Sequence, residues 1–534
     1  MNYKHFGVML DCSRNAVATV DTIKDLMRHL AKMGYNAVEL YTEDTYEING
    51  GTDPYFGQFR GRYTAAEIKE LDAYAKTLGI ELIPCVQTLA HFTNLVKQGA
   101  YGNIVDYQDI LLIDDERTYE LIDRIFATLA ENFTSRLVNI GMDEAWMVGF
   151  GEYRKKHGIP DRYDILLRHL NRVADIAKKY GFTAHMWSDM FFRIAGGDYY
   201  IPNVEIPEEV KKKVPENVEL VYWDYYHVGK EMYDGMMKTQ KGFGKNVWFA
   251  GGAWTWMGFA PLNEFSLLTM RSAMECVVEH GVQDVFLTMW GDDGGECSFY
   301  SVLPALYAIR QYADGNFDEE SIKKGFKETF GVDYDDFMLL DLLHTYCYNG
   351  KEWRFCNPTK ALLYNDCFIG KMDSHSVEEK PEEYLAHAKK LKAAAKRAGK
   401  YAYLFDELAV LCELTAVKGQ LGRRTRQAYQ SGDKKAVEAL LPDYAKSIRL
   451  VKKFYAKFKA LWDLENKPFG WEVQDVRFGG LICRLTNCKQ HLEAYVCGKI
   501  AKIDELEEPE LPFVHGQKYL GFNYYRQSVS ASEI

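Results

Sequence analysis

The sequence predicts an α/β protein in which residues 1–315 form a (β/α)₈ TIM barrel and residues 316–534 form an all-α C-terminal domain. Three observations support this prediction. Short apolar runs alternate with amphipathic stretches up to about residue 315, glycines stand where helices should end, and strand-like runs fade beyond that point.

Eight apolar runs are the expected strands, because each is short and bounded by turn residues. Amphipathic stretches between them predict helices, and Gly34, Gly79, Gly181 and Gly281 follow four of these at the usual stop position. The expected strands are 6–10, 36–41, 80–87, 136–141, 183–187, 218–223, 246–251 and 284–290. Examples of the expected helices are 19–33, 64–79, 118–133, 163–180, 263–280 and 301–313.

Long amphipathic stretches take over after residue 316, and they predict helices over 381–399, 401–430, 434–464 and 480–503. No linker separates the two parts, so we expect the helical part to pack directly against the barrel. A large helical part is compatible with a homodimer. The alternative to a barrel is an open, doubly wound sheet, but no G-x-G-x-x-G follows the first expected strand.

Composition narrows the class of function. The chain carries 65 basic and 76 acidic residues, a net charge of −11, which argues against nucleic acid as a partner. No apolar run approaches the roughly 20 residues that span a bilayer, so we expect no membrane partner. The eleven cysteines form no C-x-x-C pair, and the first residues do not resemble a signal peptide. We therefore expect a reduced, cytoplasmic protein without a cysteine-bound metal.

Acidic and aromatic residues gather where the expected strands end, which is where a (β/α)₈ barrel carries its active site. Aromatic faces with carboxylates between them suit a sugar, whose C–H faces stack on rings while its hydroxyls donate to carboxylates. The residues at these ends are Asp11, Arg14, Glu39, Tyr41, Glu43, Asp44, Gln87, His91, Asp143, Glu144, Trp187, Asp189, Tyr222, Trp223, Asp224, Tyr225, Trp254, Trp256, Trp290, Asp292 and Glu296.

Asp143 and Glu144 are adjacent acids at the end of the fourth run. Neighbours in a strand point to opposite faces, so both reach one ligand only if the strand stops there. A carboxylate disfavours ionisation of its neighbour, so one of the two can hold a proton near neutral pH, as a general acid must. We expect this pair to be the centre of the chemistry.

Two other kinds of site use the same barrel positions. Loops after the last two strands often bind phosphate, but the acids in the final loop would repel an anion. A Mg²⁺ site would use strand-end carboxylates with a Lys or His base, and no Lys stands at a strand end. H-E-x-x-H and P-loop motifs are absent. We expect no cofactor and no metal, and a metal-dependent barrel enzyme is the alternative.

Five motifs at the strand ends are Asp11-Cys-Ser-Arg14, His91 after the third run, Asn139-Ile-Gly141-Met142-Asp143-Glu144, Tyr222-Trp-Asp224 and Trp290-Gly-Asp292. Together they resemble family 20 of the glycoside hydrolases, the β-N-acetylhexosaminidases. The C-terminal helices are similar to those of a bacterial subgroup of exo-β-N-acetylhexosaminidases. Asn139 and Met142 stand where the family signature has His and Gly, and Gln87 stands where many relatives carry an acid.

The resemblance implies a retaining, exo-acting enzyme that removes terminal β-linked GlcNAc or GalNAc from an oligosaccharide or glycoconjugate. Its nucleophile is the substrate's own 2-acetamido oxygen. Glu144 would protonate the glycosidic oxygen and then activate water. Asp143 would orient the acetamide N–H, and Tyr222 or its neighbour Tyr225 would bond the acetamide carbonyl. The further implied contacts are Trp187, Trp254 and Trp290 as walls, Arg14, Asp224 and Asp292 on ring hydroxyls, and His91 on the carboxylate pair.

A barrel that holds a sugar without cleaving it is the second alternative. The retained pair of Asp143 and Glu144 argues against it.

Overall fold

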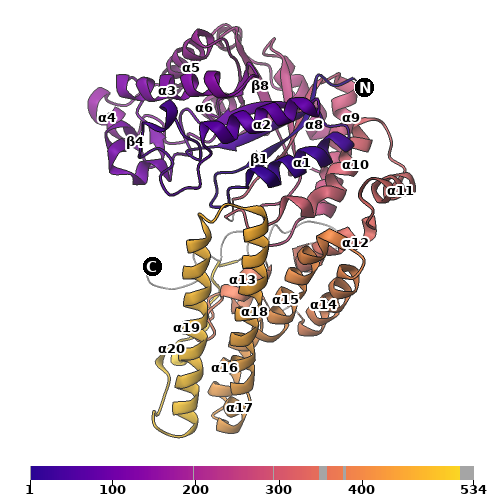
Figure 1. Ribbon diagram of the computed structural model, residues 1–534. Coiled ribbons are helices and arrows are strands. Elements are labelled where there is room, and N and C mark those ends of the chain that lie inside the picture. The colour runs from indigo at the N-terminus through magenta and orange to yellow at the C-terminus, as the bar shows by residue number, and fades with distance from the viewer. Residues whose placement is uncertain (1, 197, 293, 348–357, 377–379, 517–534) are drawn as a thin grey trace. The chain divides into compact units, whose positions relative to one another are not determined.

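The computed structural model describes residues 2–196, 198–292, 294–347, 358–376 and 380–516 (Figure 1). Its centre is a closed barrel of eight parallel strands in the order β1-β10-β9-β8-β7-β6-β3-β2. The first and last strands pair, with His5 opposite Asp284, and this closure excludes an open sheet. The strands are β1 (His5–Asp11), β2 (Ala37–Thr42), β3 (Glu81–Val86), β6 (Leu137–Asn139), β7 (Thr183–Trp187), β8 (Val218–Trp223), β9 (Val247–Gly252) and β10 (Asp284–Met289). The predicted barrel is confirmed.

Helices follow the barrel strands, as Figure 1 shows, and side-chain caps begin α1, α2, α3 and α5. The hydroxyl of Thr64 accepts from the backbone N–H of Glu67, whose carboxylate accepts in return from the Thr64 N–H, and Asp161 accepts from the first turn of its helix. The barrel helices are α1 (Val20–Lys32), α2 (Ala65–Thr77), α3 (Glu116–Asn132), α5 (Arg162–Lys179), α8 (Lys230–Lys241), α9 (Asn263–His280) and α10 (Leu303–Ala313). Each predicted helix is present within a few residues, and α8 is an addition.

The connections of the barrel carry short elements that the sequence pattern did not predict. An antiparallel ribbon of two strands lies between β3 and α3. The short elements are β4 (Val105–Tyr107), β5 (Ile110–Leu111), α4 (Glu152–His157), α6 (Asp189–Gly196), α7 (Glu208–Lys211) and the 3₁₀ helices η1 (Asn49–Gly51), η2 (Leu95–Lys97), η3 (Gly99–Ile104) and η4 (Phe299–Val302).

Polar residues lie together with Trp248 inside the barrel. The ring of Trp248 lies between the rings of His5 and His185, at centroid distances of 5.0 and 4.4 Å and nearly parallel to both. His185 in turn is hydrogen-bonded to Glu39, at 2.7 Å between Nε2 and Oε1, and both side chains are buried. Buried polar groups need such partners, so hydrogen bonds specify the interior together with ring packing.

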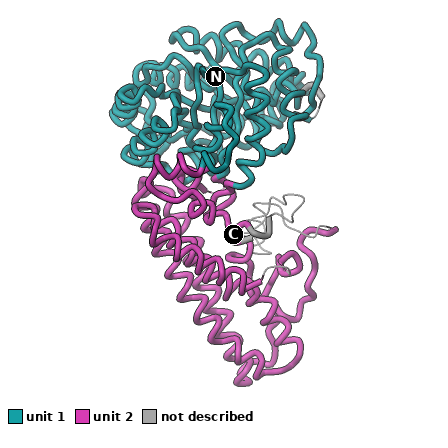
Figure 2. The backbone as a smooth tube through the Cα atoms, turned by 90° about the vertical axis from the view of Figure 1, so that its right-hand side faces the viewer, with its two compact units in different colours: residues 1–254, 264–291, 305–322 teal, residues 255–263, 292–304, 323–534 magenta. Residues whose placement is uncertain are grey.

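The chain divides into two compact units, which Figure 2 colours separately. Unit 1 comprises residues 1–254, 264–291 and 305–322, and unit 2 comprises residues 255–263, 292–304 and 323–534. The segments that directly follow β9 and β10 therefore belong to unit 2. The expected division into domains at residue 315 stays a prediction.

Residues 323–516 contain helices and no strand wherever the structure describes them, as predicted. Two predicted helices are each interrupted, after Lys418 and after Glu438, and Pro442 stands in the first turn of the helix that restarts. The elements are α11 (Glu319–Phe330), α12 (Tyr334–Met338), η5 (Leu339–Cys347), α13 (Pro358–Tyr364), η6 (Asp373–His375), α14 (Pro381–Ala395), η7 (Gly399–Tyr401), α15 (Ala402–Lys418), α16 (Leu421–Gln430), α17 (Lys434–Glu438), α18 (Leu441–Glu465), α19 (Trp471–Val496) and α20 (Asp504–Glu507). None of the described helices is long and apolar enough to cross a membrane.

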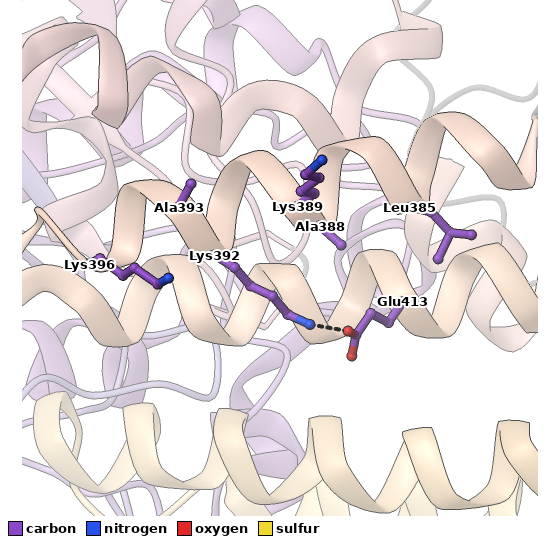
Figure 3. A pocket seen from close by; sticks show the side chains of 7 residues that line it. All are labelled: Leu385, Ala388, Lys389, Lys392, Ala393, Lys396 and Glu413. Carbon is purple, nitrogen blue, oxygen red and sulfur yellow. Dashed lines mark hydrogen bonds and ion pairs between the residues drawn. The ribbon is translucent and has the colours of Figure 1, made fainter.

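A cavity of about 410 Å³ lies beside α14 and α15 in unit 2 (Figure 3). Alanines and the stems of lysines line it, and Lys392 and Glu413 form an ion pair across it. None of the residues expected in the functional site belongs to this cavity.

Because His5 forms ion pairs with Asp284 and Glu81, we expect the free energy of unfolding of the protein to depend on pH. Burial opposes a charge on His5, but Asp284 at 2.6 Å and Glu81 at 3.2 Å outweigh it and raise the pKa of His5 to about 9. The resulting stabilisation is complete below the unfolded pKa of about 6.5 and is lost as the pH rises through 9. We expect Asp284→Asn to lower the free energy of unfolding by about 2 kcal/mol at pH 6 and by much less at pH 9.5.

Unfolding temperatures of both proteins at the two pH values measure this difference. Asp314→Asn is the control, because it removes a half-exposed carboxylate that pairs with Arg310. An equal loss at pH 6 and pH 9.5 would show that the charge on His5 contributes nothing.

Candidate active site

The chain turns sharply at the end of β6, and this turn separates Asp143 from Glu144. Gly141, Met142 and Glu144 have φ values of 70°, 67° and 52°, all in the left-handed region. A Cβ on Gly141 would lie 2.1 Å from Oε1 of Gln87, so only glycine fits there. The strand ends at Asn139, before both acids, as their use at one site requires. Left-handed φ at Met142 and Glu144 costs free energy and is typical of functional sites.

Asp143 is buried and paired. Its carboxylate accepts from Nε2 of Gln87 at 2.9 Å and lies 3.1 Å from Nε2 of His91. Burial opposes ionisation of Asp143, but the charge of His91 and these hydrogen bonds hold its pKa below the usual range. The same pairing overcomes burial at His91 and raises the pKa of that ring to about 9. Asp143 is therefore ionised at neutral pH.

Glu144 has a different environment from its neighbour. Its side chain is exposed, whereas its backbone N–H donates to Oδ2 of Asp189 at 3.2 Å. A carboxyl group that reaches solvent from an anchored backbone can take up and release protons. The geometry is thus compatible with the expectation that Asp143 and Glu144 belong to one site and have different roles there.

Asp189 is a third carboxyl group, to which the sequence pattern assigned no role. It begins α6, is fully buried, and accepts from Nε of Arg193 at 3.1 Å. Burial and the charges of Asp143 and Glu144 raise the pKa of Asp189 to about 7, although Arg193 opposes the shift. Its place at a strand end, two residues beyond Trp187, marks it in the sequence as a residue near the site. The raised pKa has no such local signal.

Arg14 lies close behind the end of β1, among carboxylates and aromatic rings of neighbouring strand ends. It contacts Asp11 at 2.8 Å and Glu43 at 3.3 Å, and its guanidinium lies 5.0 Å from the centre of the Trp290 ring. Burial raises the pKa of Glu43 to about 7, with Arg14 and His91 opposing. The carboxylate of Asp11 also accepts from the N–H of Gly291, which joins the ends of β1 and β10.

Aromatic side chains form a connected wall inside the strand ends. The indole N–H of Trp290 donates to the hydroxyl of Tyr225 at 3.2 Å. The ring of Trp187 lies 6.0 Å from that of Trp290, and its buried N–H has no hydrogen-bond partner among the described residues. Trp254 is fully buried and donates to the backbone oxygen of Tyr225 at 3.2 Å, so it supports this tyrosine from behind.

Tyr222 and Asp224 lie apart from this wall, and their expected contacts with the acetamide carbonyl and with ring hydroxyls stay predictions. Side chains alternate along β8, so Trp223 and Tyr222 face opposite sides. The ring of Trp223 stacks on that of Tyr225 at 5.5 Å, and the ring of Tyr222 packs on Phe249 at 5.5 Å. The Tyr222 hydroxyl donates to Oδ2 of Asp224 at 2.8 Å. Asp224 is fully buried and accepts from the backbone N–H of Tyr226 at 3.0 Å, so it holds the following loop. Between the two candidate tyrosines, the geometry favours Tyr225.

Asp292 is the first residue of segment 292–304, which belongs to unit 2. Its expected contact with a ring hydroxyl stays a prediction. Within the described part of the chain, no group of three or more His, Cys, Asp or Glu side chains is arranged to hold a metal ion.

An ionised, buried Asp143 thus stands next to an exposed Glu144. Burial, together with the charge of the nearby Asp143, raises the pKa of Tyr225, which accepts the hydrogen bond from Trp290. The arrangement offers a fixed negative charge beside a carboxyl group that can exchange protons. Such a pair can stabilise a positive charge on a ligand while protonating a leaving group.

Several known proteins share sequence or fold with this chain. Hexosaminidase D of Bos taurus is 26% identical over 209 residues, which cover 36% of this chain and 55% of that protein. A β-hexosaminidase of Vibrio furnissii is 28% identical over 177 residues, 27% of this chain and 29% of that protein. The chain thus spans about half or less of the length of these curated relatives. A solved GH20 exo-β-N-acetylglucosaminidase from Vibrio harveyi, in complex with N-acetylglucosamine, superposes with a TM-score of 0.48 and 16% identity, over 64% of this chain and 58% of that one.

Two family models match separate parts of the chain. The model of the glycosyl hydrolase family 20 catalytic domain matches residues 3–239, which include the β6 turn and the strands β1 to β8. The model of the glycoside hydrolase 20C C-terminal domain matches residues 335–520. Both models describe domains of one family, and the chain belongs to glycoside hydrolase family 20.

Proposed function

We propose that the protein is an exo-acting, retaining β-N-acetylhexosaminidase that hydrolyses terminal, non-reducing, β-linked GlcNAc or GalNAc from an oligosaccharide or glycoconjugate. The observation that carries the proposal is the unequal environment of the two adjacent acids. A retaining glycosidase that used both carboxyl groups would need one as nucleophile, but Asp143 is held in an ion pair with His91. This favours a mechanism in which the substrate supplies the nucleophile.

In the first step, the Glu144 carboxyl gives its proton to the glycosidic oxygen, and the oxygen of the 2-acetamido group attacks the anomeric carbon. The bond to the leaving group breaks, and a cyclic oxazolinium ion forms. Asp143 accepts a hydrogen bond from the acetamide N–H and its negative charge stabilises the cation. Tyr225 donates to the acetamide oxygen, which orients the nucleophile.

In the second step, Glu144 is a carboxylate and removes a proton from water. The water attacks the anomeric carbon from the side that the leaving group vacated, and the ring of the oxazolinium opens. Two displacements at one carbon retain its β-configuration. The cytoplasmic location and the homodimer expected from the sequence remain predictions.

Glu144→Gln removes both the acid and the base. We expect hydrolysis of substrates with poor leaving groups to fall about 10³-fold, because general acid catalysis contributes that much. A 2,4-dinitrophenyl glycoside needs no acid, so only its second step is slowed, and azide, which needs no base, should restore its turnover. Steady-state rates on both substrates, with and without azide, measure this.

Glu152→Gln is the matched control, because Glu152 is an exposed glutamate that pairs with Lys155 on α4. Equal losses on both substrates, with no rescue by azide, would remove Glu144 from the role of acid and base. Wild-type activity that disappears in chelator would favour a metal-dependent enzyme, and binding without turnover would favour a non-catalytic barrel.

Asp143→Asn removes the negative charge beside the proposed cation. We expect kcat to fall about 10²- to 10³-fold, the usual cost of a lost electrostatic contact to a charged intermediate. A thiazoline that mimics the cyclic intermediate should inhibit the wild-type protein strongly and the variant weakly. Inhibition constants on both proteins are the measurement, and a wild-type protein that ignores the thiazoline would contradict the mechanism.

Tyr225→Phe and Tyr222→Phe separate the two candidate tyrosines. Loss of the Tyr225 hydroxyl should lower kcat/KM about 10- to 100-fold, the value of a hydrogen bond to a developing charge. Loss of the Tyr222 hydroxyl leaves Asp224 without one partner and should mainly lower the unfolding temperature. Kinetics and thermal unfolding of both variants test this, and the reverse pattern would return Tyr222 to the site.

A further inference from the structure

Trp146 is unusual among the tryptophans of this protein. It is 44% exposed, whereas the eight others that the structure describes are at most 8% exposed. The adjacent Met147 is 39% exposed. A single exposed apolar side chain is common on protein surfaces, so a role for Trp146 follows only from its position and from how its ring is held.

The backbone places Trp146 directly beside the proposed acid. Its N–H donates to the carbonyl oxygen of Glu144 at 2.7 Å, across the turn that follows the left-handed residues. Its own carbonyl accepts from Nη1 of Arg162 at 2.7 Å. The backbone is therefore held on both sides, and the ring projects from a fixed point two residues beyond Glu144.

One side of the Trp146 ring is backed by a buried cation. The guanidinium carbon of Arg193 lies 3.8 Å from the ring centre, and the Arg193 side chain is only 14% exposed. Arg193 also donates to Asp189, the residue that accepts from the backbone of Glu144. A desolvated cation against the face of a tryptophan fixes the ring, so little side-chain entropy remains to be lost when a ligand binds.

We propose that Trp146, backed by Arg193, is the platform that binds the leaving group, a pyranose sugar attached through the scissile bond. This inference rests on the proposed function. Because Glu144 must reach the glycosidic oxygen, the sugar beyond that oxygen lies on the Glu144 side of the bond. The aromatic face exposed next to Glu144 can stack on the C–H face of that sugar.

The test compares two substrates that differ only in the leaving group. One is a β-linked disaccharide of N-acetylhexosamine that the wild-type protein hydrolyses, and the other is the methyl β-glycoside of the same sugar, whose leaving group needs the same acid but has no ring to stack. We expect Trp146→Ala to lower kcat/KM on the disaccharide about 10-fold and to change the value on the methyl glycoside less than about 2-fold. Trp146→Phe, which keeps an aromatic face, should recover most of the loss.

Phe469→Ala is the control, because Phe469 is an aromatic residue of unit 2 that is 40% exposed. It should leave both substrates unchanged. Equal losses on the disaccharide and the methyl glycoside in Trp146→Ala would show that the residue only supports Glu144, because both leaving groups need the acid. No loss on the disaccharide would show that the leaving group binds elsewhere. Either result overturns the platform. A wild-type protein that cleaves neither substrate would instead overturn the proposed function.

Discussion

The ion pair between Asp143 and His91 is the interaction on which the site depends. Two adjacent carboxyl groups would otherwise compete for one proton, and neither would have a defined role. The pair settles this competition, because His91 keeps a positive charge next to Asp143 and Gln87 supplies a further donor. The turn also depends on glycine at position 141, because a side chain there would displace Gln87, which donates a hydrogen bond to Asp143. Charge and backbone conformation therefore act together to make two neighbouring acids unequal.

Asp189 extends this arrangement into a chain of contacts. It joins the backbone of Glu144 to Arg193, and Arg193 joins it to the ring of Trp146. Because the pKa of Asp189 lies near 7, its charge changes in the same pH range in which a glycosidase works. The orientation of the proposed acid and that of the neighbouring ring thus depend on one buried carboxyl group.

Most of the barrel could be predicted from the sequence, because apolar runs and helix-stopping glycines are local signals that the structure keeps. The positions of Arg14, His91, Asp143 and Glu144 at strand ends could be predicted, because position at a strand end is also local. The surroundings of Tyr222 and Asp224 could not be predicted in the same way, because a motif gives the spacing of residues but not the face of the strand on which each side chain lies. The role of Asp189 could not be predicted, since its pKa depends on burial and on charges from other strands. The sequence pattern also could not predict which segments make up each unit, because this depends on contacts between segments far apart in the chain.

The order of segments in the two units has a consequence for synthesis. The chain passes from one unit to the other five times, and segments 255–263 and 292–304 are made before the helices that complete their unit. A ribosome therefore delivers the last helix of the barrel, α10, while these two short segments still lack their partners. No single cut in the chain yields both units whole. A stop codon after the last barrel helix would therefore not be enough to express the barrel by itself. Segments 255–263 and 292–304 would also have to be replaced or redesigned.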